Sequence, residues 1–392
     1  MKQITAGVDN LLRDAYLHAL QEYTKQHGPL RLRVRFAFIA LGSYGRGEMS
    51  THSDIDLGLL ISEASSINVL PPQLKGILEL METRIRALGE TNDRKDDFAK
   101  DHGAHSEIFG NTTTTTTMPA RQRNGLRMDT GGMWPLGANS GSVTGTPQTL
   151  ARNMVPNNAE APRSMEDKHA ISAPTNALLD ARYIEMPDSD RSLVDDFYRA
   201  QERNLDASYE GSESTTYGKT NRNATAVGLF LKAKTVLEQY DEVVKQQQPA
   251  MNVKTDFRQA LDWITSGLAH LCNVPKTITG TADRLDALLT EKRIDATLGM
   301  AMREAVVWVA TKRIASHLAH DDERDVYRTG EASNKVGTSD NKGLEGERSR
   351  NGLSSDLEFD AADLKLVKHY HINIVQPLLA DITRPEVFVI NA

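Results

Sequence analysis

Two short, strongly apolar segments on either side of a glycine-rich turn constrain the fold of this chain most. The first reads Ala-Phe-Ile-Ala-Leu over residues 37–41, and the second reads Ile-Asp-Leu-Gly-Leu-Leu-Ile over residues 55–61. Apolar runs of this length, bounded by turn residues, are typical of strands that enter a core. Leucine, isoleucine and alanine recur at helical spacing over residues 9–23 and 74–88. The sequence therefore predicts an α/β beginning in which helices flank two core strands.

The turn between the two strands carries residues that suit a phosphate group. Gly42 and Ser43 directly follow the first strand. A glycine lets the backbone approach a phosphate closely, and the neighbouring N–H groups and the serine hydroxyl can donate to its oxygens. Gly42 and Ser43 are therefore candidate nucleotide-binding residues.

Two aspartates lie at the start of the second strand, about ten residues further along the chain. Asp54 and Asp56 are separated by one residue. In a strand, side chains with this spacing point the same way, and their Cα atoms are about 7 Å apart. Carboxylates next to a buried strand are costly unless a cation pairs with them. Their oxygens suit Mg²⁺, or Mn²⁺, ions that hold the attacking and leaving oxygens of a phosphoryl or nucleotidyl transfer.

The same turn contains an arginine whose role the sequence leaves open. The guanidinium of Arg46 can reach triphosphate oxygens, because its fixed donors suit a spread negative charge. Alternatively, Arg46 can pair with Glu48 and brace the turn. Glu48 itself is assigned a structural role.

The rest of the chain divides into two predicted domains. Residues 1–168 form the first, with a mobile insert near 91–124 that includes six consecutive threonines and has too few apolar residues to offset its ordering entropy. Residues 169–392 form the second, because apolar residues there recur at three- and four-residue intervals, which is typical of helices. Within it, a segment near 328–355 is rich in Gly, Ser and Asn and is predicted to be a flexible linker.

Composition argues against several classes of protein. The chain has 46 basic and 53 acidic residues, a net charge of −7, which disfavours binding to nucleic acid because such binding needs a basic surface. No apolar stretch approaches the roughly 20 residues of a membrane span. Cys272 is the only cysteine, which excludes an intramolecular disulfide framework and a Cys-rich zinc site. The N-terminal residues lack a signal-peptide pattern, so we expect a cytoplasmic location; a secreted effector is also compatible.

The glycine-rich turn and the aspartates together resemble the hallmark of the nucleotidyltransferase superfamily. The sequence Gly-Ser-Tyr-Gly-Arg-Gly-Glu-Met at 42–49, followed by Ser-Asp-Ile-Asp-Leu at 53–57, is most similar to bacterial protein-PII uridylyltransferases and related signalling nucleotidyltransferases. Residues 178–184, Leu-Leu-Asp-Ala-Arg-Tyr-Ile, resemble the segment that follows the catalytic domain in these families. The resemblance implies an α+β fold, in which a polymerase-beta-like nucleotidyltransferase domain with a mixed sheet is followed by an all-α helical bundle.

The resemblance also implies further site residues. A third carboxylate usually completes such a site, as base or metal ligand, and Asp129 is our candidate because it ends a short predicted strand at 125–129. The alternative is that Asp129 caps the turn that follows. Lys254 and Arg284 are candidates to line the substrate cleft from the helical domain, or else they are solvated helix charges.

The implied activity is Mg²⁺-dependent transfer of a nucleoside monophosphate from an NTP, UTP or ATP, to a hydroxyl, with release of pyrophosphate. The implied acceptor is a protein, which would be uridylylated or adenylylated. Two alternatives stay open: transfer to a small molecule, and a catalytically silent nucleotide-binding regulatory protein. Residues 255–261 depart from the glycine-rich run expected there, so no motif specifies the acceptor.

Overall fold

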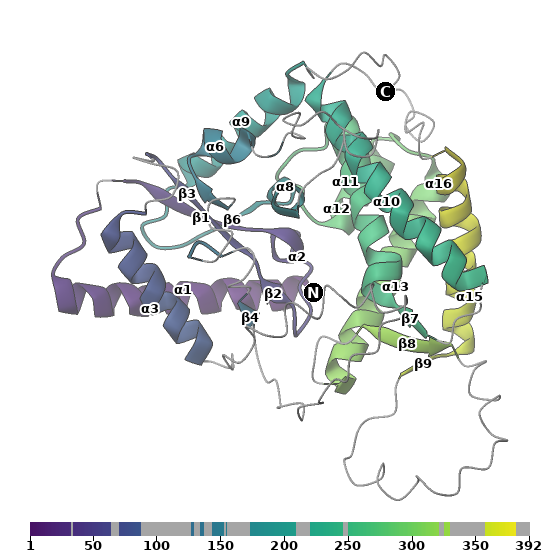
Figure 1. Ribbon diagram of the computed structural model, residues 1–392, viewed down its shortest axis with the longest axis horizontal. Coiled ribbons are helices and arrows are strands. Elements are labelled where there is room, and N and C mark those ends of the chain that lie inside the picture. The colour runs from purple at the N-terminus through teal and green to yellow at the C-terminus, as the bar shows by residue number, and fades with distance from the viewer. Residues whose placement is uncertain are drawn as a thin grey trace, which may run out of the picture.

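The computed structural model of the chain has a sheet region followed by a helical region (Figure 1). We call residues up to 208 the sheet region and residues from 220 onward the helical region. The structure describes residues 1–32, 34–63, 70–87, 127–128, 134–136, 143–152, 154, 173–208, 220–245, 250–320, 325–329 and 357–381. The expected insert near 91–124 and most of the expected linker near 328–355 lie outside these residues.

The sheet region is built on a four-stranded mixed sheet with the order β5-β3-β1-β6. Strand β1 (Phe36–Ala40) runs antiparallel to β3 (Leu57–Ile61) and to β6 (Arg182–Ile184), whereas β5 (Thr144–Gly145) runs parallel to β3. The mixed sheet expected from the sequence is therefore confirmed. Strand β6 belongs to this sheet although it follows the domain boundary expected at residue 168.

Helices cover both faces of the sheet, because successive residues of the apolar strands alternate between the two faces. Phe36 and Phe38 pack with α1 (Lys2–His27) and α3 (Pro72–Ala87) on one face. Ala37 and Ile39 pack on the other face with three helices. These are α6 (Pro147–Arg152), α8 (Ala173–Leu179) and α9 (Arg191–Asp206). Figure 1 shows the resulting three layers.

Two short elements position the candidate site at one end of the sheet. Helix α2 (Gly42–Gly45) is a single turn that follows β1 after Leu41. Strand β2 (Asp54–Ile55) precedes β3 and pairs in parallel with β4 (Arg127–Met128). The glycine-rich turn follows the end of β1, and the aspartate segment precedes β3. Because β1 and β3 are adjacent and antiparallel, both segments lie at the same end of the sheet.

The helical region packs around its own apolar core, which includes the aromatic residues Tyr240, Phe257, Trp308 and Tyr370. A π-helical segment (Val253–Arg258) runs directly into helix α11. The helices of this region are α10 (Asn221–Lys245), α11 (Gln259–Leu271), α12 (Thr281–Thr290), α13 (Ala296–His320), α15 (Ala361–Tyr370) and α16 (Gln376–Asp381), with a second π-helical segment at His371–Val375. No helix in the described parts of the chain is long and apolar enough to cross a membrane.

The second half of the chain is not purely helical, contrary to the expected all-α bundle. Strands β7 (Ala250–Asn252), β8 (Val326–Thr329) and β9 (Glu358–Phe359) form a three-stranded sheet beside α13. The start of the expected linker therefore belongs to β8. Strands of two to four residues are too short for their periodicity to be recognised in a sequence.

A glycine substitution tests the packing of α2. A Cβ at Gly45 would lie 2.2 Å from the carbonyl oxygen of Asp180 and 2.7 Å from that of Ala40. Because both neighbours are backbone atoms, we expect Gly45→Ala to lower the free energy of unfolding by about 1–3 kcal/mol or more. Gly7→Ala in α1 is the matched control, since nothing lies within 4 Å of a Cβ there. We expect it to stabilise the protein by about 0.5–1 kcal/mol. Urea unfolding measures both, and an unchanged midpoint for Gly45→Ala would contradict this packing.

Candidate active site

The glycine-rich turn and the second aspartate lie against each other. The amide of Leu41 donates to the carbonyl oxygen of Asp56 at 3.0 Å. Gly42 has φ +52°, and a Cβ there would lie 2.8 Å from Oδ2 of Asp56. Only a residue without a side chain fits this approach. The Asp56 carboxylate is therefore held directly over the turn that we expect to bind phosphate.

Asp54 and Asp56 lie on the accessible side of their segment. Both are partly exposed, whereas the alternating residues Ile55 and Leu57 are fully buried. This alternation directs both carboxylates to one side of the strand. Carboxylate oxygens are ligands of the kind that Mg²⁺ prefers. The described residues contain no group of three or more His, Cys, Asp or Glu side chains arranged to hold a metal ion.

Asp129, the candidate third carboxylate, lies outside the described residues. The two residues before it form β4. In the parallel backbone pairing of β4 with β2, Arg127 is the register partner of Asp54, and Met128 that of Ile55. The strand expected from the sequence at 125–129 is thus present in part, next to the strand that carries Asp54.

The turn is fixed from the sheet side by a tyrosine, an aspartate and an arginine. The Tyr44 hydroxyl donates to Asp9 at 2.6 Å, and Arg182 donates two hydrogen bonds to the same carboxylate at 2.9 and 3.0 Å. The guanidinium of Arg182 also lies over the Tyr44 ring, 5.4 Å from its centroid. Burial, together with the Asp9 charge, raises the pKa of Tyr44 well above its ordinary value. Tyr44 therefore stays neutral and donates to Asp9.

Arg46 pairs with three carboxylates. Its Nε lies 2.9 Å from Glu48, and its two terminal nitrogens lie 2.6 Å from Asp180 and 2.9 Å from Asp262. Burial alone would lower the pKa of Arg46, but Asp262, Asp180 and Glu48 outweigh it and raise the pKa. Arg46 therefore pairs with Glu48, which is the bracing alternative that the sequence left open. It also pairs with Asp180 and Asp262, two acids that are distant in the sequence.

Arg284 is a buried bridge and does not line an open cleft. Its Nη1 donates to Asp180 at 2.6 Å and to Ser266 at 2.7 Å, and its Nε donates to the carbonyl oxygen of Ile278 at 3.0 Å. Only 3% of Arg284 is exposed. Lys254, the other residue considered for the cleft, lies partly buried in the π-helical segment.

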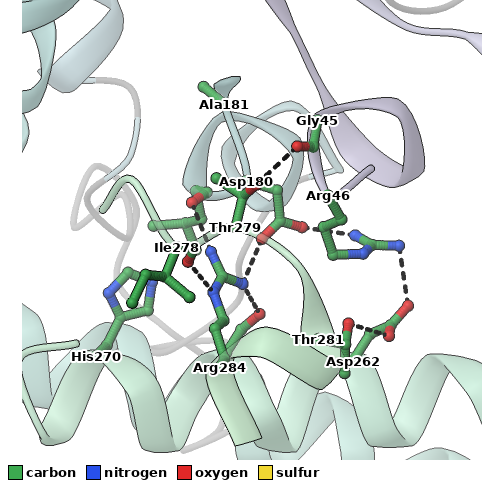
Figure 2. Close-up of polar contacts among 12 residues, drawn as sticks. Gly45, Arg46, Asp180, Ala181, Asp262, His270, Ile278, Thr279, Thr281 and Arg284 are labelled. Carbon is green, nitrogen blue, oxygen red and sulfur yellow. Dashed lines mark hydrogen bonds and ion pairs between the residues drawn. The ribbon is translucent and has the colours of Figure 1, made fainter. Parts of the chain in front are cut away.

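Six largely buried charged side chains lie between the two regions and form what we call the charge cluster. Figure 2 shows Arg46, Asp180, Asp262 and Arg284 of this cluster. The sheet region contributes Arg46, Glu48 and Asp180, and the helical region contributes Arg258, Asp262 and Arg284. Within the charge cluster, three ion pairs join the two regions: Arg46 with Asp262, Arg258 with Glu48, and Arg284 with Asp180. The three positive and three negative charges balance, so the cluster is neutral only when both regions are docked.

The charges of the cluster support one another. Burial would raise the pKa of Asp262, but Arg258 and Arg46 hold it below its ordinary value. Burial would likewise lower the pKa of Arg258, but Asp262 and Glu48 raise it. Arg258 and Asp262 were not among the residues predicted from the sequence. One signal could have indicated them, because an arginine and an aspartate four residues apart in an apolar helix are positioned to pair.

The N-terminal part of the chain matches a protein family. Residues 1–103 match the family described as "Putative nucleotidyltransferase DUF294". This match supports a relationship of residues 1–103 to the nucleotidyltransferase superfamily. The match includes the turn at Gly42 and both aspartates, Asp54 and Asp56. A search of curated proteins finds no match to the chain.

Removing one charge from the cluster should destabilise the protein strongly. Asp180 is 2% exposed and pairs with both Arg46 and Arg284. Asp180→Asn keeps the shape but leaves both guanidinium groups short of one charge, so we expect a loss of about 3–5 kcal/mol in the free energy of unfolding.

The matched control is Asp286→Asn, which breaks the half-exposed pair of Asp286 with Arg303. It should cost less than about 1 kcal/mol. Chemical denaturation measures the free energy of unfolding of both variants. Equal decreases would show that the cluster contributes no more to stability than an exposed ion pair.

Proposed function

We propose that the protein transfers a nucleoside monophosphate from an NTP to a hydroxyl group, with release of pyrophosphate. One observation carries the proposal. Asp54 in β2 and Asp56 between β2 and β3 are both partly exposed, and the Asp56 carboxylate lies against Gly42 of the Gly42-Ser43 turn. Carboxylates for a divalent cation and donors for phosphate are therefore adjacent, as nucleotidyl transfer requires.

Each residue has a distinct role in this proposal. The backbone N–H groups at Gly42 and Ser43, with the serine hydroxyl, bind the triphosphate. Asp54 and Asp56 would hold Mg²⁺ or Mn²⁺, and their partly exposed oxygens beside a residue without Cβ fit such an ion. When bound there, such an ion would supply positive charge near the attacking and leaving oxygens of an in-line displacement.

The proposed reaction is a substitution at the α-phosphorus of the NTP. The acceptor oxygen forms a bond to the α-phosphorus, the bond from that phosphorus to the bridging oxygen breaks, and pyrophosphate leaves. The proton of the acceptor hydroxyl passes to a base, for which Asp129 is our candidate. Its support is that it directly follows β4, the strand paired with β2.

The acceptor that we propose is a protein hydroxyl of Tyr, Ser or Thr, and the donor is UTP or ATP. This part rests on the resemblance of residues 42–57 and 178–184 to protein-modifying nucleotidyltransferases. Incubating the pure protein with each α-labelled NTP and Mg²⁺ or Mn²⁺, with and without a cell lysate, tests it. A labelled protein band supports the proposal. Label in a small molecule selects that acceptor class instead, and NTP binding without transfer selects a silent regulatory protein.

We expect a graded series from substitutions in the site. Asp54→Ala and Asp56→Ala should each abolish transfer while the fold is retained, because either removes a carboxylate that holds the cation. Ser43→Ala should weaken the binding free energy of the NTP by only about 1.5–3 kcal/mol, because one hydrogen bond to a charged oxygen is lost and the backbone donors remain. Label transfer measures all three variants, with Asp195→Ala at an exposed position of α9 as control. Normal turnover in Asp54→Ala or Asp56→Ala would end the metal assignment.

A separate substitution distinguishes a base from a structural cap at Asp129. If Asp129 accepts the proton, Asp129→Asn should suppress transfer while NTP binding, measured by calorimetry, largely survives. If Asp129 only caps a turn, stability should fall by about 1 kcal/mol and turnover should stay unchanged. Unchanged turnover therefore removes Asp129 from the mechanism.

A further inference from the structure

We infer that Glu48 is a positioning residue, which sets the geometry of the phosphate-binding turn according to how the helical region is docked. The inference rests on the proposed function of that turn. Glu48 was assigned only a structural role from the sequence, and it is not expected to touch the nucleotide. Its two sets of contacts, one through the main chain and one through the side chain, carry the inference.

The main chain of Glu48 is bonded to the residue whose hydroxyl we expect to bind phosphate. The amide of Glu48 donates to the carbonyl oxygen of Ser43 at 2.9 Å, and the amide of Arg46 donates to that of Gly42 at 3.0 Å. Residues 42–48 therefore form a closed loop. A displacement of Glu48 is transmitted to Ser43 through one hydrogen bond.

The side chain of Glu48 is held mostly from the helical region. Oε1 accepts from the backbone amide of Thr281 at 2.7 Å, and Oε2 accepts from the Thr281 hydroxyl at 3.1 Å and from Arg258. Arg46, from the same turn, adds a contact at 2.9 Å. The start of helix α12 and the π-helical segment thus fix a carboxylate that belongs to the turn.

A second contact between the regions acts on the same turn. The Thr279 hydroxyl donates to the carbonyl oxygen of Gly45 at 2.8 Å. At the start of the turn, the Asp56 carboxylate lies against Gly42. The turn is therefore contacted both by the segment that provides the proposed metal ligands and by the helical region, which holds Glu48.

Buried ion pairs of this kind specify geometry more surely than they add stability. The desolvation cost of buried charges can cancel their attraction, whereas a planar guanidinium accepts a carboxylate in few orientations. Rates of transfer depend steeply on the alignment of the reacting groups, so a displacement of about 1 Å can cost 10²-fold. Loss of the Glu48 contacts should accordingly lower kcat more than it weakens NTP binding, because the backbone donors of the turn remain.

Two variants test the inference. Glu48→Gln removes the charge. Thr281→Val removes only the hydroxyl, whose single proton is shared between Glu48 at 3.1 Å and Asp262 at 2.8 Å, and it is the milder change should Glu48→Gln fail to fold. Thr290→Val is the matched control, because Thr290 is exposed in the same helix and donates to a backbone carbonyl oxygen of that helix. We expect kcat for transfer to fall tenfold or more in both test variants, KM for the NTP to change less than threefold, and the control to match the wild type.

A double-mutant cycle and hydrogen exchange separate positioning from stability. If both residues act through one contact, the double variant should be no slower than the slower single variant. Amides of residues 42–48 should also exchange faster in both test variants than in the control. Reduced unfolding free energy with kcat and exchange of the turn unchanged would overturn the inference. Absence of transfer by the wild type would instead refute the proposed function, and the exchange measurement would still decide whether Glu48 positions the turn.

Discussion

The structure depends on a group of six largely buried charges between two regions of the chain. Arg46 in the glycine-rich turn and Arg284 in helix α12 both bind Asp180 at 2.6 Å. Neither arginine could be buried without its partners, because an unpaired charge in a protein interior costs several kcal/mol. The docked arrangement of the two regions is therefore the one in which every charge of the cluster has a partner. Gly42 and Ser43 of the proposed active site lie in the same turn as Arg46.

The local features of the candidate site are the ones that a sequence can reveal. The apolar run before Gly42 and the spacing of Asp54 and Asp56 are contained in about twenty consecutive residues. Strand alternation fixes the direction of two side chains that are two positions apart. The same applies to helices α1 and α3, whose periodicity extends over several turns. These features required no knowledge of how distant segments meet.

Features that depend on distant segments could not be predicted in this way. Arg46 binds Asp180 and Asp262, which are 134 and 216 residues away, and a guanidinium suits a carboxylate as well as a phosphate. Strand β6 joins the sheet from beyond the expected domain boundary, and three short strands interrupt the expected all-α bundle. In both the ion pairs and the strand pairings, the partner lies in a separate segment of the chain. The strands are also too short to show a period.

The central claim is that Asp54, Asp56 and the Gly42-Ser43 turn together bind a metal–NTP complex. Anomalous diffraction from crystals soaked with Mn²⁺ and an NTP analogue that cannot be cleaved at the α-phosphorus tests this most directly. The claim predicts a manganese peak within coordination distance, about 2.0–2.3 Å, of both carboxylates, with the triphosphate oxygens on the amides and hydroxyl of the turn. A nucleotide bound elsewhere, or manganese absent from the aspartate pair while the analogue occupies the turn, would contradict it.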